Sequence, residues 1–149
     1  MAAMVESIEV GRSPEDVFSY AVDPSHLAEW QESLVSVRQE GDGPLAVGTK
    51  TIHTRRVGRG ERTMTLELTE HDPPRAYAFR GVDGPIRAVG SLTVDPLEDG
   101  ARSRVTIDLD FEGHGLGKLL VPLVVRRQAR DELPRNLRNL KQRLESSAA

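Results

Sequence analysis

The sequence predicts an α+β domain in which a curved antiparallel sheet of about seven strands folds around a long C-terminal helix, with two short helices after the first strand. From Leu34 to Phe111 apolar and polar residues alternate, and turn residues recur at hairpin intervals, which is typical of an antiparallel sheet with one covered face. From Leu119 to Leu144 the spacing of apolar residues changes to that of one helical face. An apolar sheet face and an apolar helix stripe are both buried when they pack on each other.

The N-terminal part predicts one short strand and two short helices. Residues 5–10 alternate and are followed by Gly11, which indicates a strand. Ser13-Pro14, followed by two acidic residues, has the side-chain cap, the proline and the negative charge that favour a helix start. Asp23-Pro24 ends this helix and predicts the start of a second one, which carries Trp30.

The strands after these helices share one pattern, in which apolar residues occupy every second position. Turn residues separate them, and the alternation is clearest at residues 63–69, 91–95 and 104–111. No internal repeat and no low-complexity linker interrupts them. We therefore expect one sheet with one apolar face.

The C-terminal stretch predicts a helix that lies on this face. Its apolar stripe contains Val121, Val125, Ala129, Leu133, Leu137, Leu140 and Leu144. Pro134 falls in the helix interior and predicts a bend near Arg130. Ala129 is small and lies between larger apolar groups, so the bend and the small side chain would together leave room beneath the helix.

The composition predicts a single cytoplasmic domain over residues 1–149. A chain of 149 residues with 38% hydrophobic residues can bury a core, and a net charge of −3 argues against a nucleic-acid partner. The absence of cysteine excludes disulfides and thiolate sites. The start lacks a signal-peptide pattern, and the longest apolar patch, residues 119–125, is too short to span a bilayer, so no membrane partner is expected. The oligomeric state stays open, with a homodimer as one option.

The order of elements is similar to that of the helix-grip superfamily, also called START-like or SRPBCC, and within it to the polyketide cyclase/dehydrase-like branch. The motifs that carry this resemblance span nearly the whole chain: Ser13-Pro14-Glu15-Asp16-Val17-Phe18, Asp23-Pro24 followed by Trp30, Val47-Gly48-Thr49, Leu68-Thr69-Glu70-His71-Asp72-Pro73-Pro74 leading to Ala78-Phe79-Arg80, Asp99-Gly100-Ala101-Arg102, and Gly115-Leu116-Gly117-Lys118-Leu119-Leu120. The resemblance implies a small hydrophobic ligand in a cavity between the sheet and the C-terminal helix. It implies either cyclisation or dehydration of a polyketide-like substrate, or a carrier or sensor that does not change its ligand. An interaction protein that uses the outer sheet face is a third hypothesis.

His53 is the most interesting candidate for catalysis, because imidazole is the side chain most easily placed near neutral pH. If Thr51, His53 and Arg55 point inward, Arg55 could hold an enolate-like oxygen while His53 moves a proton. If Ile52 points inward instead, His53 and Arg55 are solvated strand positions, because a shift of one residue exchanges the two faces. The resemblance favours the inward orientation.

Tyr77 and Phe79 share one strand face, and both are expected to point inward. Tyr77 is a second catalytic candidate, although most buried tyrosines only find a hydrogen-bond partner. Trp30 lies either near the mouth of the pocket or in the core. The complete set of expected ligand-binding residues is Tyr20, Trp30, Arg55, Met64, Leu66, Phe79, Ala129 and Leu133.

Other signals predict no further chemistry. The stretch Gly113-His114-Gly115-Leu116-Gly117-Lys118 resembles a phosphate-binding loop, but Glu112 and Leu119 replace its first glycine and its hydroxyl residue. The histidines lack ligand spacing, so neither a metal site nor a cofactor is expected.

Overall fold

The computed structural model describes residues 4–146, which form a seven-stranded antiparallel sheet, two short helices and a C-terminal helical arm. The strands are β1 (Met4–Val10), β2 (Leu34–Gln39), β3 (Lys50–Val57), β4 (Gly60–Asp72), β5 (Ala76–Asp83), β6 (Ile86–Leu97) and β7 (Arg102–Gly113). The helices are α1 (Pro14–Ala21), α2 (Leu27–Trp30), α3 (Gly117–Leu120) and α4 (Arg126–Ser146), with a short 3-10 turn at Glu98–Gly100 and a π-helical turn, η2, at Val121–Val125. The predicted fold class is confirmed.

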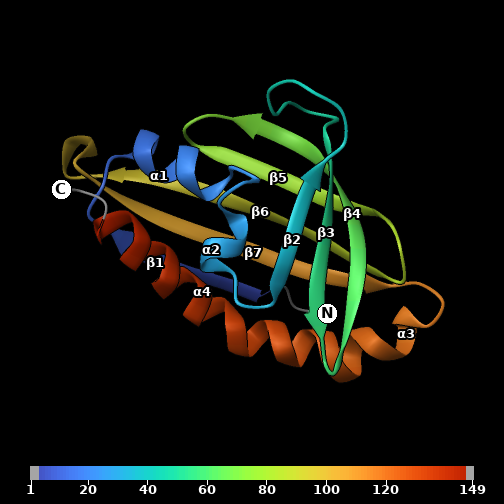
Figure 1. The fold of residues 1–149 in the computed structure, drawn as a ribbon. Coiled ribbons are helices and arrows are strands. Elements are labelled where there is room, and N and C mark those ends of the chain that lie inside the picture. The colour runs from blue at the N-terminus through green and yellow to red at the C-terminus, as the bar shows by residue number, and fades with distance from the viewer. Residues whose placement is uncertain (1–3, 147–149) are drawn as a thin grey trace.

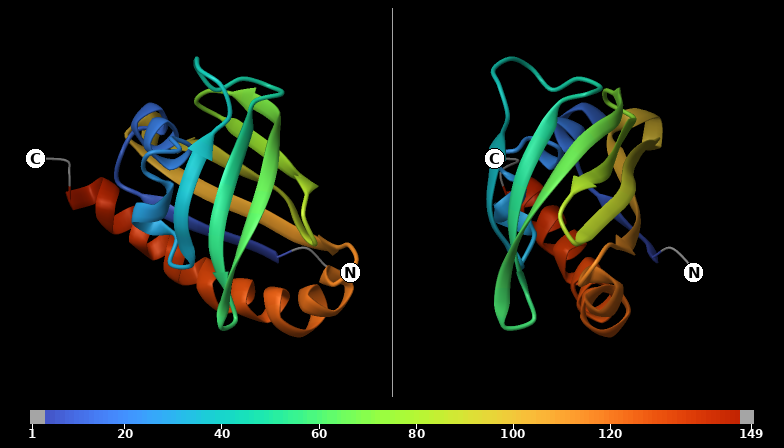
Figure 2. Two further views of the ribbon diagram at one scale, coloured as in Figure 1. Left: turned by 45° about the vertical axis from the view of Figure 1, so that its right-hand side comes forward. Right: turned by 90° about the vertical axis from the view of Figure 1, so that its right-hand side faces the viewer.

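The sheet is antiparallel throughout and has the strand order β1-β7-β6-β5-β4-β3-β2. The first strand therefore pairs with the last one, and the hairpins between β2 and β7 follow in chain order. Figure 1 and Figure 2 show that the sheet curls and that α4 runs along its concave side, with α1 and α2 at one end. The concave face and the helix bury each other's apolar side chains.

The C-terminal helical arm differs from the regular helix that the sequence predicts. It begins at Gly117, widens into the π-helical turn, and continues as α4 to Ser146. Pro122 lies in the wide turn, and its ring and missing amide hydrogen disfavour ordinary bonding to the preceding turn. Pro134 lies inside α4, and the bend expected near Arg130 stays a prediction.

The second short helix is also shorter than predicted. Residues 23–26 form a turn in which the Asp23 side chain accepts hydrogen bonds from the amide and hydroxyl of Ser25, and α2 begins only at Leu27. Asx turns of this kind compete with helix formation for the same backbone groups.

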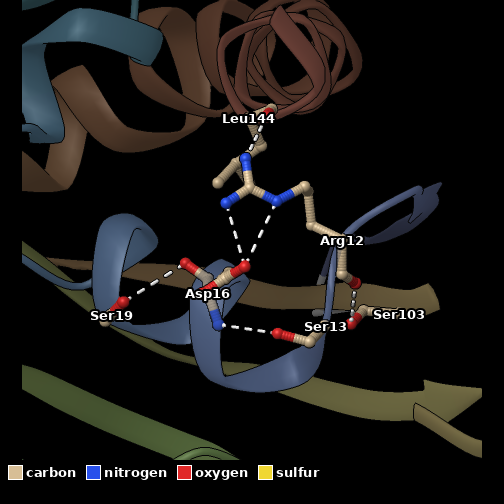
Figure 3. A network of polar contacts seen from close by, with 6 residues as sticks. All are labelled: Arg12, Ser13, Asp16, Ser19, Ser103 and Leu144. Carbon is tan, nitrogen blue, oxygen red and sulfur yellow. Dashed lines mark hydrogen bonds and ion pairs between the residues drawn. The ribbon is translucent and has the colours of Figure 1, made fainter. Parts of the chain in front are cut away.

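A polar network joins the start of α1 to the end of α4 (Figure 3). Ser13 caps α1 as predicted, because its hydroxyl accepts from the Asp16 amide at 3.3 Å. Arg12 donates to the Asp16 carboxylate at 2.9 Å and to the Leu144 carbonyl at 2.7 Å, while the Ser103 hydroxyl donates to the Arg12 carbonyl at 2.8 Å. These bonds fasten α1, α4 and β7 together at one end of the curled sheet.

The same end contains the most tightly packed part of the core. Val10, Val17, Val105 and Leu140 are all completely shielded from solvent. They come from β1, α1, β7 and the C-terminal half of α4, so the helix and the sheet are in full contact here. The other half of the concave face, beneath the first turns of α4, is packed differently.

Candidate functional site

A cavity of about 130 Å³ lies between the concave face of the sheet and the first half of α4. Apolar side chains form most of its wall, and they come from α1 and α2, from strands β3 to β7, and from the helical arm. They are Ala21, Leu27, Trp30, Val57, Met64, Leu66, Phe79, Ala88, Leu92, Ile107, Leu109, Phe111, Val125, Ala129 and Leu133. The tightly packed residues at the other end of α4 are not part of this wall.

One part of the wall is polar. It combines the segment between α2 and β2, parts of β3, β5 and β6, and one side of α4, and its residues are Gln31, Ser33, His53, Arg55, Arg56, Tyr77, Ser91, Gln128, Glu132 and Asn136. Within residues 4–146 no group of His, Cys, Asp or Glu side chains is arranged to hold a metal ion. The polar wall therefore offers hydrogen-bonding groups, the Arg55 guanidinium and the carboxyl group of Glu132.

Nine of the ten residues predicted from the sequence line the cavity. Two of them are the catalytic candidates His53 and Tyr77, and the other seven are the expected ligand-binding residues Trp30, Arg55, Met64, Leu66, Phe79, Ala129 and Leu133. Tyr20 lies elsewhere. Its hydroxyl donates to the Glu29 carboxylate at 2.7 Å, and its ring stacks on His26 at a centroid distance of 4.7 Å. Tyr20 therefore supports the link between α1 and α2.

Strand β3 turns His53 toward the interior. Thr51 and His53 are 2% and 3% exposed, and in the pairing with β4 they lie opposite Leu66 and Met64. Residues directly opposite each other in an antiparallel pair point to the same face, so the apolar residues of β4 fix the orientation of β3. Of the two orientations left open by the sequence, the structure has the inward one.

His53 differs in its protonation from the expectation. Its Nε2 lies 2.9 Å from the Thr51 hydroxyl, and within the described residues its Nδ1 has no hydrogen-bond partner. Burial, followed by the nearby Arg55 cation, lowers the pKa of His53 to about 3. The imidazole is therefore neutral at neutral pH, and the catalytic role expected of it stays a prediction.

Arg55 is a cation of the polar wall. Its guanidinium donates to the Ser33 hydroxyl at 3.3 Å and to the Gln31 side-chain oxygen. Burial lowers the pKa of Arg55 to about 10, although the attraction of Glu132 opposes this shift, so the side chain stays charged at neutral pH. Burial also raises the pKa of Tyr77 to about 12, which leaves its hydroxyl protonated and able to donate.

Glu132 and Asn136 are site residues that the sequence analysis missed. Both are only 8% exposed, and within the described residues Glu132 Oε1 has no hydrogen-bond partner. Asn136 accepts from the Glu32 amide at 3.0 Å. The sequence does contain a signal, because Val125, Ala129, Glu132 and Asn136 follow one another at four-three-four spacing along one helix face.

Two contacts hold the first turns of α4 on the sheet. The Gln128 side chain accepts from the Gly58 amide at 3.0 Å and donates to the Arg56 carbonyl at 2.7 Å, which fixes the β3–β4 hairpin. Arg126 lies 2.6 Å from the Asp110 carboxylate and donates to the Phe111 carbonyl at 2.8 Å, which fixes β7. The helix is thus attached on both sides of the cavity.

The curled sheet, the long helix across it and the interior polar wall define a helix-grip protein. The chain matches the family described as "Polyketide cyclase / dehydrase and lipid transport" over residues 1–145, and it belongs to this family. The resemblance inferred from the sequence motifs is thereby confirmed.

Relatives with similar sequences and structures agree with this assignment. Two uncharacterised proteins of Mycobacterium tuberculosis, from strains CDC 1551 and H37Rv, are each 27% identical over 110 residues, which cover 73% of this chain and 77% of theirs. A crystal structure of a Thermus thermophilus protein has a TM-score of 0.79 at 18% identity and covers 99% of both chains. The di-domain ARO/CYC BexL from the BE-7585A biosynthetic pathway has a TM-score of 0.72 at 17% identity, covering 97% of this chain and 47% of BexL. At these identities the two structures support the fold alone.

Within the described residues no helix has the length and apolar character needed to cross a membrane.

Proposed function

We propose that the protein binds a small, mostly apolar molecule with an oxygen substituent in the cavity between the sheet and α4. The observation that carries this proposal is the Arg55 cation at one side of a wall that is otherwise largely apolar. A guanidinium enclosed in this way favours a carbonyl, enolate or carboxylate oxygen as its partner, while the apolar wall favours a ring or a short chain.

The size of the cavity limits the ligand. About 130 Å³ is comparable to the ~150 Å³ cavity that holds one benzene molecule in another protein, and it is smaller than the ~300 Å³ at which drug-sized pockets begin. A molecule with one ring fits the space as it stands. A longer polyketide-like chain requires the wall or the first turns of α4 to move outward.

For catalysis, we propose that the site would promote cyclisation or dehydration of a polyketide-like substrate by holding it folded. Arg55 would stabilise an enolate oxygen, and the protonated Tyr77 hydroxyl would donate to the same oxygen or to a neighbouring one. His53, which is neutral, would take the proton whose loss forms the enolate, and would return it to the oxygen of the attacked carbonyl or to the hydroxide that leaves as water. A non-catalytic carrier or sensor is the second candidate, and the low pKa of His53 favours it because such an imidazole is a weak base at neutral pH.

Binding can be tested with benzene and phenol as probes, by following the methyl signals of the cavity wall in NMR titrations. We expect both to bind, with phenol preferred by at least roughly tenfold because one charge-assisted hydrogen bond is worth ~1.5–3 kcal/mol. Tyr77→Phe and Arg55→Met should reduce the preference for phenol and preserve benzene binding. Arg38→Met, on the exposed side of β2, is the control. Failure of both probes to shift any wall signal would refute the proposed binding.

Catalysis needs a separate measurement. Incubation with a linear poly-β-carbonyl thioester, followed by chromatography of the products, should show a cyclic or dehydrated product that is lost in Tyr77→Phe. If the thioester binds and is recovered unchanged, the carrier or sensor function is supported and the catalytic one is refuted.

A further inference from the structure

The outer face of the segment from Leu116 to Leu123 exposes three large apolar side chains. Leu116 is 54% exposed, Leu119 is 62% exposed and Leu123 is 69% exposed. They follow one another at spacings of three and four residues, so they lie on one side of α3 and the π-helical turn. Pro122 is exposed in the same turn. This leucine face lies at the opposite end of the helical arm from the polar network of Figure 3.

Basic residues surround the leucine face. Residues 113–130 contain Lys118, Arg126, Arg127 and Arg130 and no acidic residue, in a chain whose net charge is −3. Arg126 is buried against Asp110, whereas the other three basic side chains are exposed. Arg127 and Arg130 continue the spacing of the leucines along the outside of the helix. The acidic residues that flank this stretch in the chain are Glu112 and Asp131.

We propose that the leucine face docks on the surface of an anionic lipid membrane. An apolar stripe flanked by lysine and arginine lies stably in the interface between water and lipid, where the leucines enter the acyl boundary and the basic groups meet the phosphates. A second copy of the chain fits less well. A two-fold contact through this face would bring Lys118, Arg127 and Arg130 of both copies to one interface, where like charges would repel.

Docking of this kind differs from spanning a membrane. The sequence argument against a membrane partner rests on the length of the apolar patch, and that argument applies only to a segment that crosses the bilayer. The inner side of the same helical arm carries Val125 and Ala129, which form part of the cavity wall. A docked chain would therefore hold its cavity one helix away from the lipid, whatever the cavity binds.

The experiment measures flotation of the full chain with vesicles of phosphatidylcholine alone and with vesicles that contain one quarter phosphatidylglycerol. We expect binding to the anionic vesicles only, and a loss of this binding at high salt. Arg127→Gln with Arg130→Gln should weaken it roughly fivefold for each charge removed. Leu119→Ser with Leu123→Ser should weaken it roughly tenfold for each leucine. Val47→Ser, at an apolar residue that is 66% exposed in a distant loop, is the matched control and should bind as the original chain does.

Three results would overturn the proposal. Equal binding to neutral and anionic vesicles would remove the role of charge, and an equal loss in Val47→Ser would remove the role of the leucine face. A dimer in light scattering that the leucine variant converts to monomer would assign this face to a second copy. Thermal unfolding of each variant, followed by circular dichroism, ensures that lost binding is compared among folded proteins. A failure here leaves the proposed function of the cavity untouched, because the benzene and phenol titrations need no membrane.

Discussion

Ala129→Leu distinguishes a hollow interior from a filled one, because the two cases predict effects of opposite sign. Leaving about 130 Å³ vacant costs on the order of 3 kcal/mol at ~24 cal/mol per Å³. Leucine adds three carbons to this space, each worth ~0.8 kcal/mol when fully buried, and ordering its side chain costs ~0.5–1 kcal/mol. We expect the free energy of unfolding to rise by about 1–2 kcal/mol, and the midpoint of thermal unfolding to rise by ~2–8 °C.

The same substitution should weaken phenol binding at least ~10-fold, because the added side chain occupies the space that the probe needs. Urea unfolding gives the change in stability, and the NMR titration gives the change in affinity. Val105→Ile is the control. Val105 is fully buried in the solid part of the core, where an extra carbon overpacks and should lower the free energy of unfolding by ~1–3 kcal/mol. If Ala129→Leu also destabilises by this amount and phenol binding is unchanged, the space beneath the helix is not available and the argument from the cavity fails.

Two further predictions concern protonation and backbone packing. The pKa of His53 is 6.5 in the unfolded chain and about 3 in the folded one, so between these pH values only the unfolded state binds the proton. The free energy of unfolding therefore falls as the pH falls from 6.5 to about 3, by up to ~1.4 kcal/mol per pH unit. His53→Gln keeps a hydrogen-bonding group for Thr51 without this titration, and urea unfolding measured across the window should show a shallower fall; parallel curves for the two proteins would contradict a buried neutral imidazole. Gly117→Ala would place a Cβ 1.7 Å from the Pro85 carbonyl oxygen, so we expect a loss of at least ~2 kcal/mol in urea unfolding, whereas Gly60→Ala, with no heavy atom within 4 Å of its added Cβ, should change little. Equal stabilities of the two alanine variants would show that the approach of Gly117 to Pro85 is not required.

The sequence predicts the strands of the sheet better than it predicts which side chains of β3 point inward. Alternation predicts the inner faces of β4, β6 and β7 because each has several large apolar residues at one parity. Strand β3 has Ile52 as its main apolar residue, and that residue alone would suggest the opposite face. Pairing with Met64 and Leu66 of β4 determines which face of β3 points inward, and this register cannot be predicted from the sequence of β3 alone.

The pKa of His53 and the inward position of Glu132 could not be predicted from the sequence either. A histidine in a strand has an ordinary pKa until its surroundings are known, and only the burial of His53 beside Arg55 moves the value far below neutral. Glu132 was overlooked for a related reason, because a charged residue on a helix is usually solvated. Its place between Ala129 and Asn136 on the inward stripe becomes meaningful once the helix is known to cross a cavity.

The cavity itself follows from how α4 is attached. Gln128 fastens the helix to the β3–β4 hairpin and Arg126 fastens it to β7, and in the sheet β5 and β6 lie between these two attachments. The helix therefore crosses the concave face and is held at the strands on both sides of it. Ala88 of β6 and Ala129 of the helix itself carry small side chains that leave a gap between sheet and helix, whereas farther along the helix Leu140 is fully buried in the solid core. One helix thus closes the core at its C-terminal end and covers the cavity at its N-terminal end.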